Sequence, residues 1–177
     1  EESVRASAVK ILAAMRSRES IPLLTKAVED KSDAIRIAAV DGLGSLADPN
    51  CIPGLSRAIA DSELSIRTQA VLHLRKIATK ETFPPLVKVA LYDKSAALRL
   101  QSVNMLGQIA DTSVIVELSR ALNDPELTIR LAAIGTIGLL GGPAAAHSLP
   151  IAFADKDTCV RQSAAVACGA LASVESL

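Results

Sequence analysis

An aliphatic residue followed by arginine recurs along this chain at a nearly constant spacing. The six arginines are Arg5, Arg36, Arg67, Arg99, Arg130 and Arg161, at intervals of 31, 31, 32, 31 and 31 residues. An aspartate stands six residues before each of the last five arginines, at Asp30, Asp61, Asp93, Asp124 and Asp155. The 177 residues are therefore organised as repeated units, and any fold must place equivalent residues in equivalent positions.

Each unit carries two helical patterns. In the first half, the aliphatic residue before arginine, a small residue and a later aliphatic residue fall on one helix face, as at Ile35, Ala39 and Leu43. The second half begins with Ile-Pro or Phe-Pro, as at Pro22 and Pro53, and proline is tolerated in the first turn of a helix. Each unit is therefore predicted to be a helical hairpin.

The pattern predicts an all-α chain with a 31-residue period. The predicted helices span residues 3–16, 20–29, 31–47, 50–60, 62–79, 82–92, 94–110, 113–123, 125–141, 144–154 and 156–173. Asp124 is predicted as an N-cap and Pro125 as the first residue of its helix. The repeats are predicted at 1–30, 31–61, 62–93, 94–124, 125–155 and, in part, 156–177. Since no such unit buries its own apolar face, we expect one stacked array over residues 1–177.

These patterns resemble a known repeat. The aspartate, the arginine six residues beyond it, the small residue, a glycine and the later Ile-Pro-x-x-Leu resemble HEAT repeats of the phycobilisome-lyase-like type over essentially the whole chain. The glycines in question are Gly44, Gly107, Gly138 and Gly169. The resemblance implies a right-handed α-solenoid of about five and a half hairpins. It also implies a concave side, lined by the second helices, where partners bind.

Composition argues against nucleic acid and membrane. Lys and Arg together number 19, as do Asp and Glu, so the chain has no long-range field of one sign. Only Phe83, Tyr92 and Phe153 are aromatic, which leaves few faces for stacking bases. Residues 131–154 carry no Asp, Glu, Lys or Arg, but Gly141, Gly142 and Pro143 interrupt them, so no membrane span is expected.

The cysteines and the first residue bear on location. Cys51, Cys159 and Cys168 form no CxxC pair, which is typical of a reduced, cytoplasmic protein. The chain begins at Glu1 without Met, so we expect a fragment of a longer protein.

No catalytic residue, cofactor or metal is predicted. His73 and His147 lie in different units, and metal binding needs converging ligands. Deoxyhypusine hydroxylase, which is built of similar repeats, holds iron through paired His-Glu motifs, and neither histidine here precedes a glutamate. No phosphate-binding loop or nucleophile motif occurs at an informative spacing. The chain is therefore predicted not to be an enzyme.

The Asp and Arg series is interpreted as a structural ladder. Each aspartate can cap the helix that carries the arginine, and each arginine can bond the turn of a neighbouring unit. The ladder residues are Asp30, Arg36, Asp61, Arg67, Asp93, Arg99, Asp124, Arg130, Asp155 and Arg161. The alternative is that the guanidinium groups clamp phosphates.

A second basic row is the candidate binding surface. Lys26, Arg57, Lys88 and Arg120 each stand 21 residues after a repeat arginine, and Tyr92 closes one of these second helices. We expect these side chains on the concave side, where they suit an acidic peptide. The simpler interpretation is that the basic side chains keep a helix face soluble and that Tyr92 packs at a helix end.

Three functions remain open. The first is a non-catalytic scaffold or adaptor that binds a protein or peptide. The second, which the family resemblance allows, is a bilin lyase-type or chaperone-like protein that acts on a client protein. The third is nucleic-acid binding, against which charge and composition argue.

The chain ends suggest self-association. Solenoids usually close with polar capping repeats, but the last predicted helix offers an apolar edge. The edge residues are Val160, Ala164, Ala167, Cys168 and Leu171. We expect end-to-end association through such uncapped terminal repeats.

Overall fold

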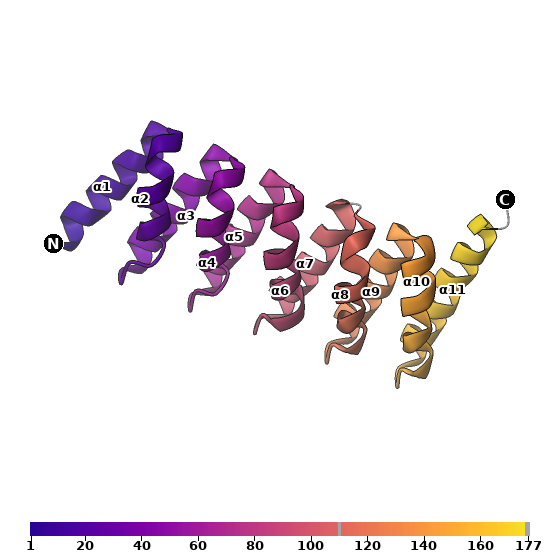
Figure 1. The fold of residues 1–177 in the computed structure, drawn as a ribbon. Coiled ribbons are helices and arrows are strands. Elements are labelled where there is room, and N and C mark those ends of the chain that lie inside the picture. Colours follow the sequence, from indigo (N-terminus) through magenta and orange to yellow (C-terminus); the bar gives the residue numbers. More distant parts are fainter. Residues whose placement is uncertain (110, 176–177) are drawn as a thin grey trace. The chain divides into compact units, whose positions relative to one another are not determined.

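A computed structural model describes residues 1–109 and 111–175 of the chain. These residues form eleven α-helices and six short 3-10 helices, and no strand occurs among them (Figure 1). The predicted all-α class is therefore confirmed. The chain divides into two compact units, Glu1–Pro85 and Leu86–Leu177, which are described separately.

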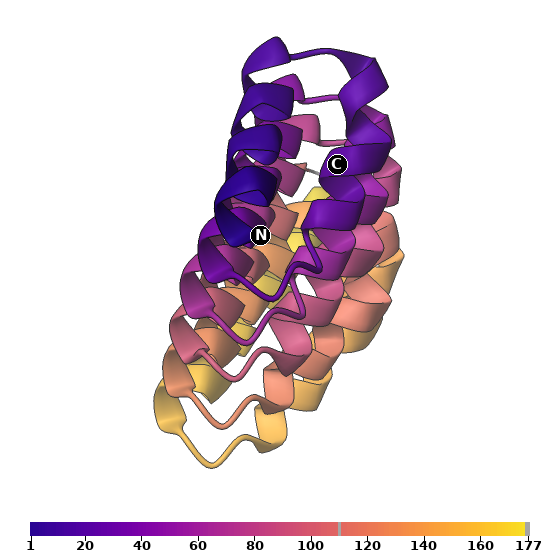
Figure 2. The same ribbon diagram turned by 90° about the vertical axis from the view of Figure 1, so that its left-hand side faces the viewer.

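Unit 1 contains two layers of helices (Figure 2). The first-helix layer consists of α1 (Glu2–Met15), α3 (Asp33–Leu46) and α5 (Leu64–Ile77). The second-helix layer consists of α2 (Ile21–Ala27) and α4 (Ile52–Ala58), each preceded by a 3-10 turn, η1 (Arg18–Ser20) or η2 (Pro49–Cys51). A third turn, η3 (Lys80–Thr82), follows α5. Helix α3 packs against α1, α2, α4 and α5, so the hairpins stack side by side.

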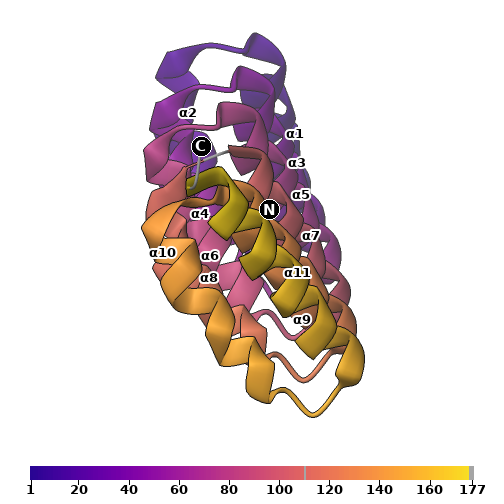
Figure 3. The ribbon, with the colours of Figure 1, turned by 90° about the vertical axis from the view of Figure 1, so that its right-hand side faces the viewer.

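Unit 2 repeats this arrangement (Figure 3). Its first helices are α7 (Ala96–Ile109), α9 (Leu127–Leu140) and α11 (Thr158–Glu175). Its second-helix layer has three parts. The first is α6 (Phe83–Tyr92) from Leu86 on, and the second is η4 (Thr112–Val114) with α8 (Ile115–Leu118) and η5 (Ser119–Asn123). The third is α10 (Gly142–Ser148) with η6 (Leu149–Ala154). Helix α9 packs against both α7 and α11.

The repeated apolar positions form the core of each unit. The small residues Ala39, Ala70, Ser102, Ala133 and Ala164 are all fully buried. The aliphatic residues that precede the last five repeat arginines, such as Ile35 and Ile66, are buried as well, whereas Val4, before Arg5, is exposed. Burying one such side chain contributes about 1.5–3 kcal/mol. The same few positions therefore stabilise every hairpin contact.

Two glycines allow close approach between first helices. A Cβ added at Gly44 would lie 2.0 Å from the ring of His73, and one added at Gly107 would lie 2.9 Å from Cγ2 of Thr136. The ring of His73 thus occupies the space above Gly44, where no side chain fits. This packing gives a physical reason for the recurring glycine in the sequence.

The first helices begin about two residues later than predicted. Helices α3, α5, α7, α9 and α11 begin at Asp33, Leu64, Ala96, Leu127 and Thr158. The carboxylate of each loop aspartate accepts a hydrogen bond from the N–H two residues on, for example Asp61 Oδ1 from Glu63 N at 2.9 Å. That bond holds the following two residues in a turn before the helix.

Two predicted boundaries need a further remark. The prediction that Asp124 is an N-cap and Pro125 the first helical residue is wrong, because Glu126 is the N-cap of α9 and Asp124 accepts from Glu126 N at 2.9 Å. Ala110, the last residue of the predicted helix 94–110, lies outside the described residues.

The predicted apolar edge of the last helix is partly wrong. Val160 and Ala164 are fully buried, because α11 packs against α9 and η6 through this face. Ala167, Cys168 and Leu171 are half-buried. Val166, on another face of α11, is instead 74% exposed.

Candidate binding surface

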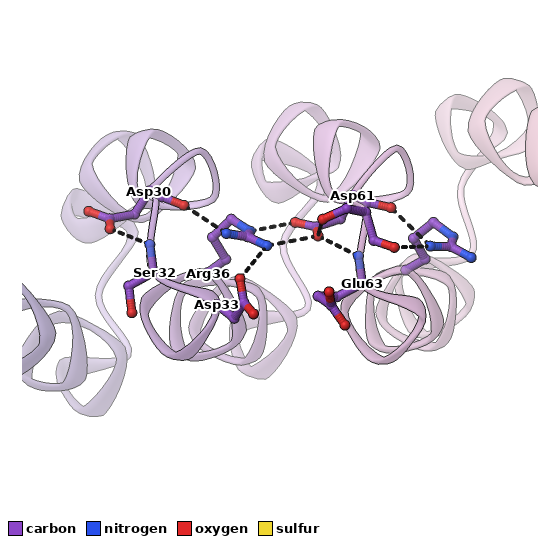
Figure 4. Close-up of polar contacts among 8 residues, drawn as sticks. Asp30, Ser32, Asp33, Arg36, Asp61 and Glu63 are labelled. Atoms are coloured by element: carbon purple, nitrogen blue, oxygen red, sulfur yellow. Dashed lines mark hydrogen bonds and ion pairs between the residues drawn. The ribbon is translucent and has the colours of Figure 1, made fainter.

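The aspartate and arginine side chains of unit 1 form a continuous polar chain between repeats (Figure 4). Arg36 donates from Nε to Asp61 Oδ2 at 2.6 Å and from Nη2 to Asp61 Oδ1 at 3.0 Å. Its Nη1 donates to the backbone oxygen of Asp30 at 3.0 Å. The Arg36 and Asp61 side chains are only 12% and 6% exposed, so this two-point pair is largely shielded from water. One guanidinium therefore ties together two successive interhelical turns.

The same geometry recurs elsewhere. Arg5 bonds Asp30 at 2.7 Å, Arg99 bonds Asp124 at 2.8 Å and Arg130 lies 2.8 Å from Asp155. Arg67 and Arg161 each donate from Nη1 to the backbone oxygen of the aspartate six residues earlier, Asp61 or Asp155. Asp93 accepts from Ser95 N at 2.7 Å. That the series serves folding rather than ligand binding stays a prediction.

The ladder lowers the pKa of its carboxyl groups. The hydrogen bond from Arg5 lowers the pKa of Asp30 to about 2. At Asp61 and Asp124, burial raises the pKa, but the bonds from arginine and from a backbone N–H outweigh it, and the pKa is lowered. The backbone bond from Asp157, with Arg130, lowers the pKa of Asp155. These carboxylates are therefore ionised at neutral pH.

The four predicted surface cations are all exposed. In unit 1, Lys26 lies on α2 and Arg57 on α4, and Arg57 Nη1 is 3.6 Å from Glu29 Oε1. In unit 2, Lys88 lies on α6 and Arg120 in η5. Each unit thus presents two basic side chains on its second-helix layer.

Unit 2 also brings Tyr92 and Arg120 together. Arg120 Nη1 donates to the Tyr92 hydroxyl at 3.2 Å and lies 3.2 Å from Glu117 Oε2. Sequence reasoning named Tyr92 and Arg120 separately but missed Glu117 and, in unit 1, Glu29, which takes the position of Tyr92 relative to the basic residue. The available signal was spacing, because Tyr92 precedes Arg120, and Glu29 precedes Arg57, by the same 28 residues.

A shallow hollow of about 340 Å³ lies at the ends of the second helices of unit 1. Its polar lining consists of Glu29, Asp30, Arg36, Arg57, Asp61 and Ser62. Both arginines are already paired with carboxylates, Arg36 with Asp61 and Arg57 with Glu29. This hollow therefore offers no uncompensated charge to a ligand.

Neither a metal cluster nor a membrane span is found in the described part of the chain. No three His, Cys, Asp or Glu side chains there converge as a metal ion would require. No helix among the same residues is both long and apolar enough to cross a bilayer. His73 is a buried packing residue, with Nε2 3.4 Å from Asp41 Oδ1.

The repeat geometry agrees with the comparison of this sequence with protein families. The HEAT repeat family matches residues 1–75, 32–102 and 83–169. The chain belongs to the HEAT-repeat family. A comparison with curated protein sequences finds no match.

Solved structures show the same fold. Human deoxyhypusine hydroxylase is 18% identical with a TM-score of 0.59, over 98% of this chain and 81% of that one. The CpcE and CpcF complex of phycocyanin lyase from Nostoc sp. PCC7120 is 24% identical with a TM-score of 0.53, over 96% and 71%. A designed armadillo repeat protein in complex with the peptide (KR)4 is 20% identical with a TM-score of 0.54, over 93% and 92%. At these identities the HEAT chain shares the helical repeat fold with each of them.

Proposed function

We propose that this HEAT-repeat chain is a non-catalytic scaffold or adaptor that binds a protein or peptide through its second helices. The observation that carries the proposal is the placement of charge. Arg36, Arg99 and Arg130 of the ladder are largely buried in ion pairs, whereas the side chains of the second basic row are exposed on the second helices: Lys26, Arg57, Lys88 and Arg120. Exposed basic side chains are free to meet a partner of opposite charge.

The exposed cations favour an acidic partner. The designed armadillo protein that shares the fold binds the basic peptide (KR)4, so a helical repeat surface can hold an extended, charged peptide. Here the exposed side chain at the repeated second-helix position is Lys or Arg in four of the repeats. A complementary peptide would carry Asp or Glu.

Reversal of these charges tests the proposal. In one variant, Lys26, Arg57, Lys88 and Arg120 are changed to Glu. A control variant with the same net charge carries Glu at four exposed cations of the first-helix layer or its ends: Lys10, Arg16, Arg75 and Lys76. Quantitative capture from the native host should lose partners with the first variant and keep them with the second. Equal capture by both variants would contradict the proposal.

Three further expectations belong with this proposal. A bilin lyase-type or chaperone-like role is the alternative, and a free bilin that binds the chain more tightly than the captured protein partner would favour it.

End-to-end self-association rests on exposed apolar side chains at Val4, Ile11 and Val166. Sedimentation with rising concentration tests it, since a constant monomer mass rules it out. A cytoplasmic location stays a prediction.

A further inference from the structure

The single irregular interval of the repeat has a defined structural origin. The repeat arginines are 31 residues apart except for the 32 residues between Arg67 and Arg99. In the other repeats, the loop aspartate N–H bonds a carbonyl three residues back: Asp30 to Ala27, Asp61 to Ala58, Asp124 to Ala121 and Asp155 to Ala152. Asp93 N instead bonds Val89 O, four residues back, at 3.1 Å. The extra residue therefore lets α6 continue as an α-helix to Tyr92.

This extension places an aromatic ring on the second-helix layer of unit 2. Tyr92 is 66% exposed, and its hydroxyl accepts from Arg120 Nη1 at 3.2 Å. In unit 1, the residue 28 positions before Arg57 is Glu29, which neutralises that arginine. The same relative position is thus filled by a carboxylate in unit 1 and by a neutral phenol in unit 2. Tyr92 adds no carboxylate beside Arg120, whereas Glu29 lies 3.6 Å from Arg57; the carboxylate paired with Arg120 is that of Glu117, at 3.2 Å.

The surroundings of Tyr92 and Arg120 are both basic and apolar. Lys88 lies one helical turn before Tyr92 on α6. Val116, four residues before Arg120, is 66% exposed. Ile151, at the position equivalent to Arg120 in the next hairpin, is 53% exposed, and η5 packs against η6. Exposed aliphatic groups therefore occur both in the hairpin that carries Arg120 and in the next one.

The charge of Arg120 is only loosely satisfied within the chain. Its ion pair with Glu117 is an i,i+3 contact with side chains 62% and 49% exposed, and such exposed pairs contribute little to stability. Within the described residues, Nε and Nη2 of Arg120 donate to no protein atom. A carboxylate from a partner could take this two-nitrogen edge with favourable geometry.

We propose that a surface site on unit 2 binds an acidic peptide segment in which Glu or Asp adjoins an aliphatic residue. The site consists of Tyr92, Arg120, Lys88, Val116 and Ile151. This inference rests on the proposed scaffold function and assigns its anchor to unit 2. The peptide carboxylate binds the Nε and Nη2 edge of Arg120, and the neighbouring aliphatic side chain covers the Tyr92 ring, Val116 or Ile151. A basic peptide is repelled by Arg120 and Lys88.

The natural sequence supplies a probe for this site. Tyr92 is the only tyrosine and the chain has no Trp, so its ultraviolet emission reports on this position alone. The ligand used is a synthetic acetylated peptide that repeats Ser-Glu-Leu and carries a fluorescein label. Anisotropy of the label measures binding to the whole chain, and an unlabelled copy is used to follow Tyr92 emission. Peptides that repeat Ser-Lys-Leu and Ser-Gln-Ser, and an oligothymidine strand, serve as comparisons.

We expect the Ser-Glu-Leu peptide to bind and to change Tyr92 emission. Arg120→Ala should weaken binding about tenfold, which corresponds to about 1.4 kcal/mol, because a charge-assisted hydrogen bond is lost. Tyr92→Phe should weaken it less, because the ring remains. Glu117→Gln should tighten binding by freeing Arg120. The matched control is Arg57→Ala in unit 1, which should bind as the natural chain does.

Several results would overturn the site. One is that Arg120→Ala leaves the affinity for the peptide unchanged and that the peptide does not alter Tyr92 emission. The peptide would then bind at another surface, and the scaffold function would still hold. Another is preferred binding of the lysine peptide or of oligothymidine. Binding of none of the probes also contradicts the inference, while the capture experiment judges the scaffold function separately. All four substituted side chains are on the surface, so each variant should keep the natural urea midpoint, which checks its fold.

Discussion

Each unit carries arginine side chains beside carboxylates both at its interhelical turns and on its second helices, but the two sets differ in burial and in their partners. At the interhelical turns, Arg36 and Asp61 are largely buried, bond at 2.6 Å and follow a pattern that every repeat keeps. On the second helices, Arg57 and Arg120 are exposed, and their partners differ: Glu29 at 3.6 Å for the first, Tyr92 and Glu117 for the second. Uniform buried pairs can hold repeats together, whereas variable exposed ones leave room for a partner. Each prediction below tests or refines this contrast.

Acid should have the largest effect, because it acts on the whole ladder at once. The folded pKa of Asp30 is about 2, whereas an unfolded aspartate titrates near about 3.9. A depressed folded pKa gives stability that is fully present above the unfolded value and is lost as the pH falls through the folded value. The urea midpoint should therefore be flat above about pH 5 and fall steeply between about pH 4 and pH 2. A midpoint that holds constant down to pH 2 would show that the ladder contributes little.

Asp61→Ala should be the most damaging of the single substitutions discussed here. It leaves the Arg36 guanidinium, only 12% exposed, without its buried carboxylate and with the exposed Asp33 as its remaining ion-pair partner, and it leaves Glu63 N without an acceptor. We expect a loss on the order of 3 kcal/mol in unfolding free energy, measured by urea titration. Affinity for the captured partner should not change. Lost affinity at full stability would move the ladder into the binding surface.

Gly44→Ala should destabilise the chain by about 2 kcal/mol. The new Cβ would lie 2.0 Å from the His73 ring, which must move away. Gly135→Ala is the matched control on another first helix, because nothing lies within 4 Å of an added Cβ there. It should stabilise α9 by about 0.5–1 kcal/mol. Equal thermal shifts for the two variants would refute the packing argument.

Ala47→Gly should stabilise unit 1 by about 0.5–1 kcal/mol. Ala47 follows α3 with a φ of 49°, in the left-handed region that disfavours a side chain. The equivalent residue in the fifth repeat is Gly141, with a φ of 70°. Thermal unfolding measures the gain, and the same change at Ala78, which also has a φ of 49°, should act alike.

Arg57→Ala should have the smallest effect on folding. The pair with Glu29 is long and both side chains are more than half exposed. We expect a change within about 0.5 kcal/mol. A loss comparable to that of Asp61→Ala would remove the contrast between the buried and exposed pairs.

The sequence alone determined the helical hairpins and their period. Burial of residues such as Ala39 and Ile66 follows from a 3.6-residue period, which is a local property of the chain. The Pro of Ile-Pro correctly marked the start of α2 and α4, since proline tolerates few helical positions. The exposure of Lys26 and Arg57 was equally predictable from their place on the polar side of these helices.

Only the tertiary structure decided which side chains meet. The delayed start of α9 depends on a bond between Asp124 and Glu126 N that competes with helix formation, and the pattern of apolar residues does not record it. The packing of His73 on Gly44 joins helices from neighbouring repeats. The 32-residue interval between repeat arginines was likewise visible in the sequence. Its consequence, the hydrogen bond from Arg120 to the Tyr92 hydroxyl, depends on the packing of the neighbouring hairpin. Period and burial are set by local geometry, whereas such contacts depend on how separate helices approach one another.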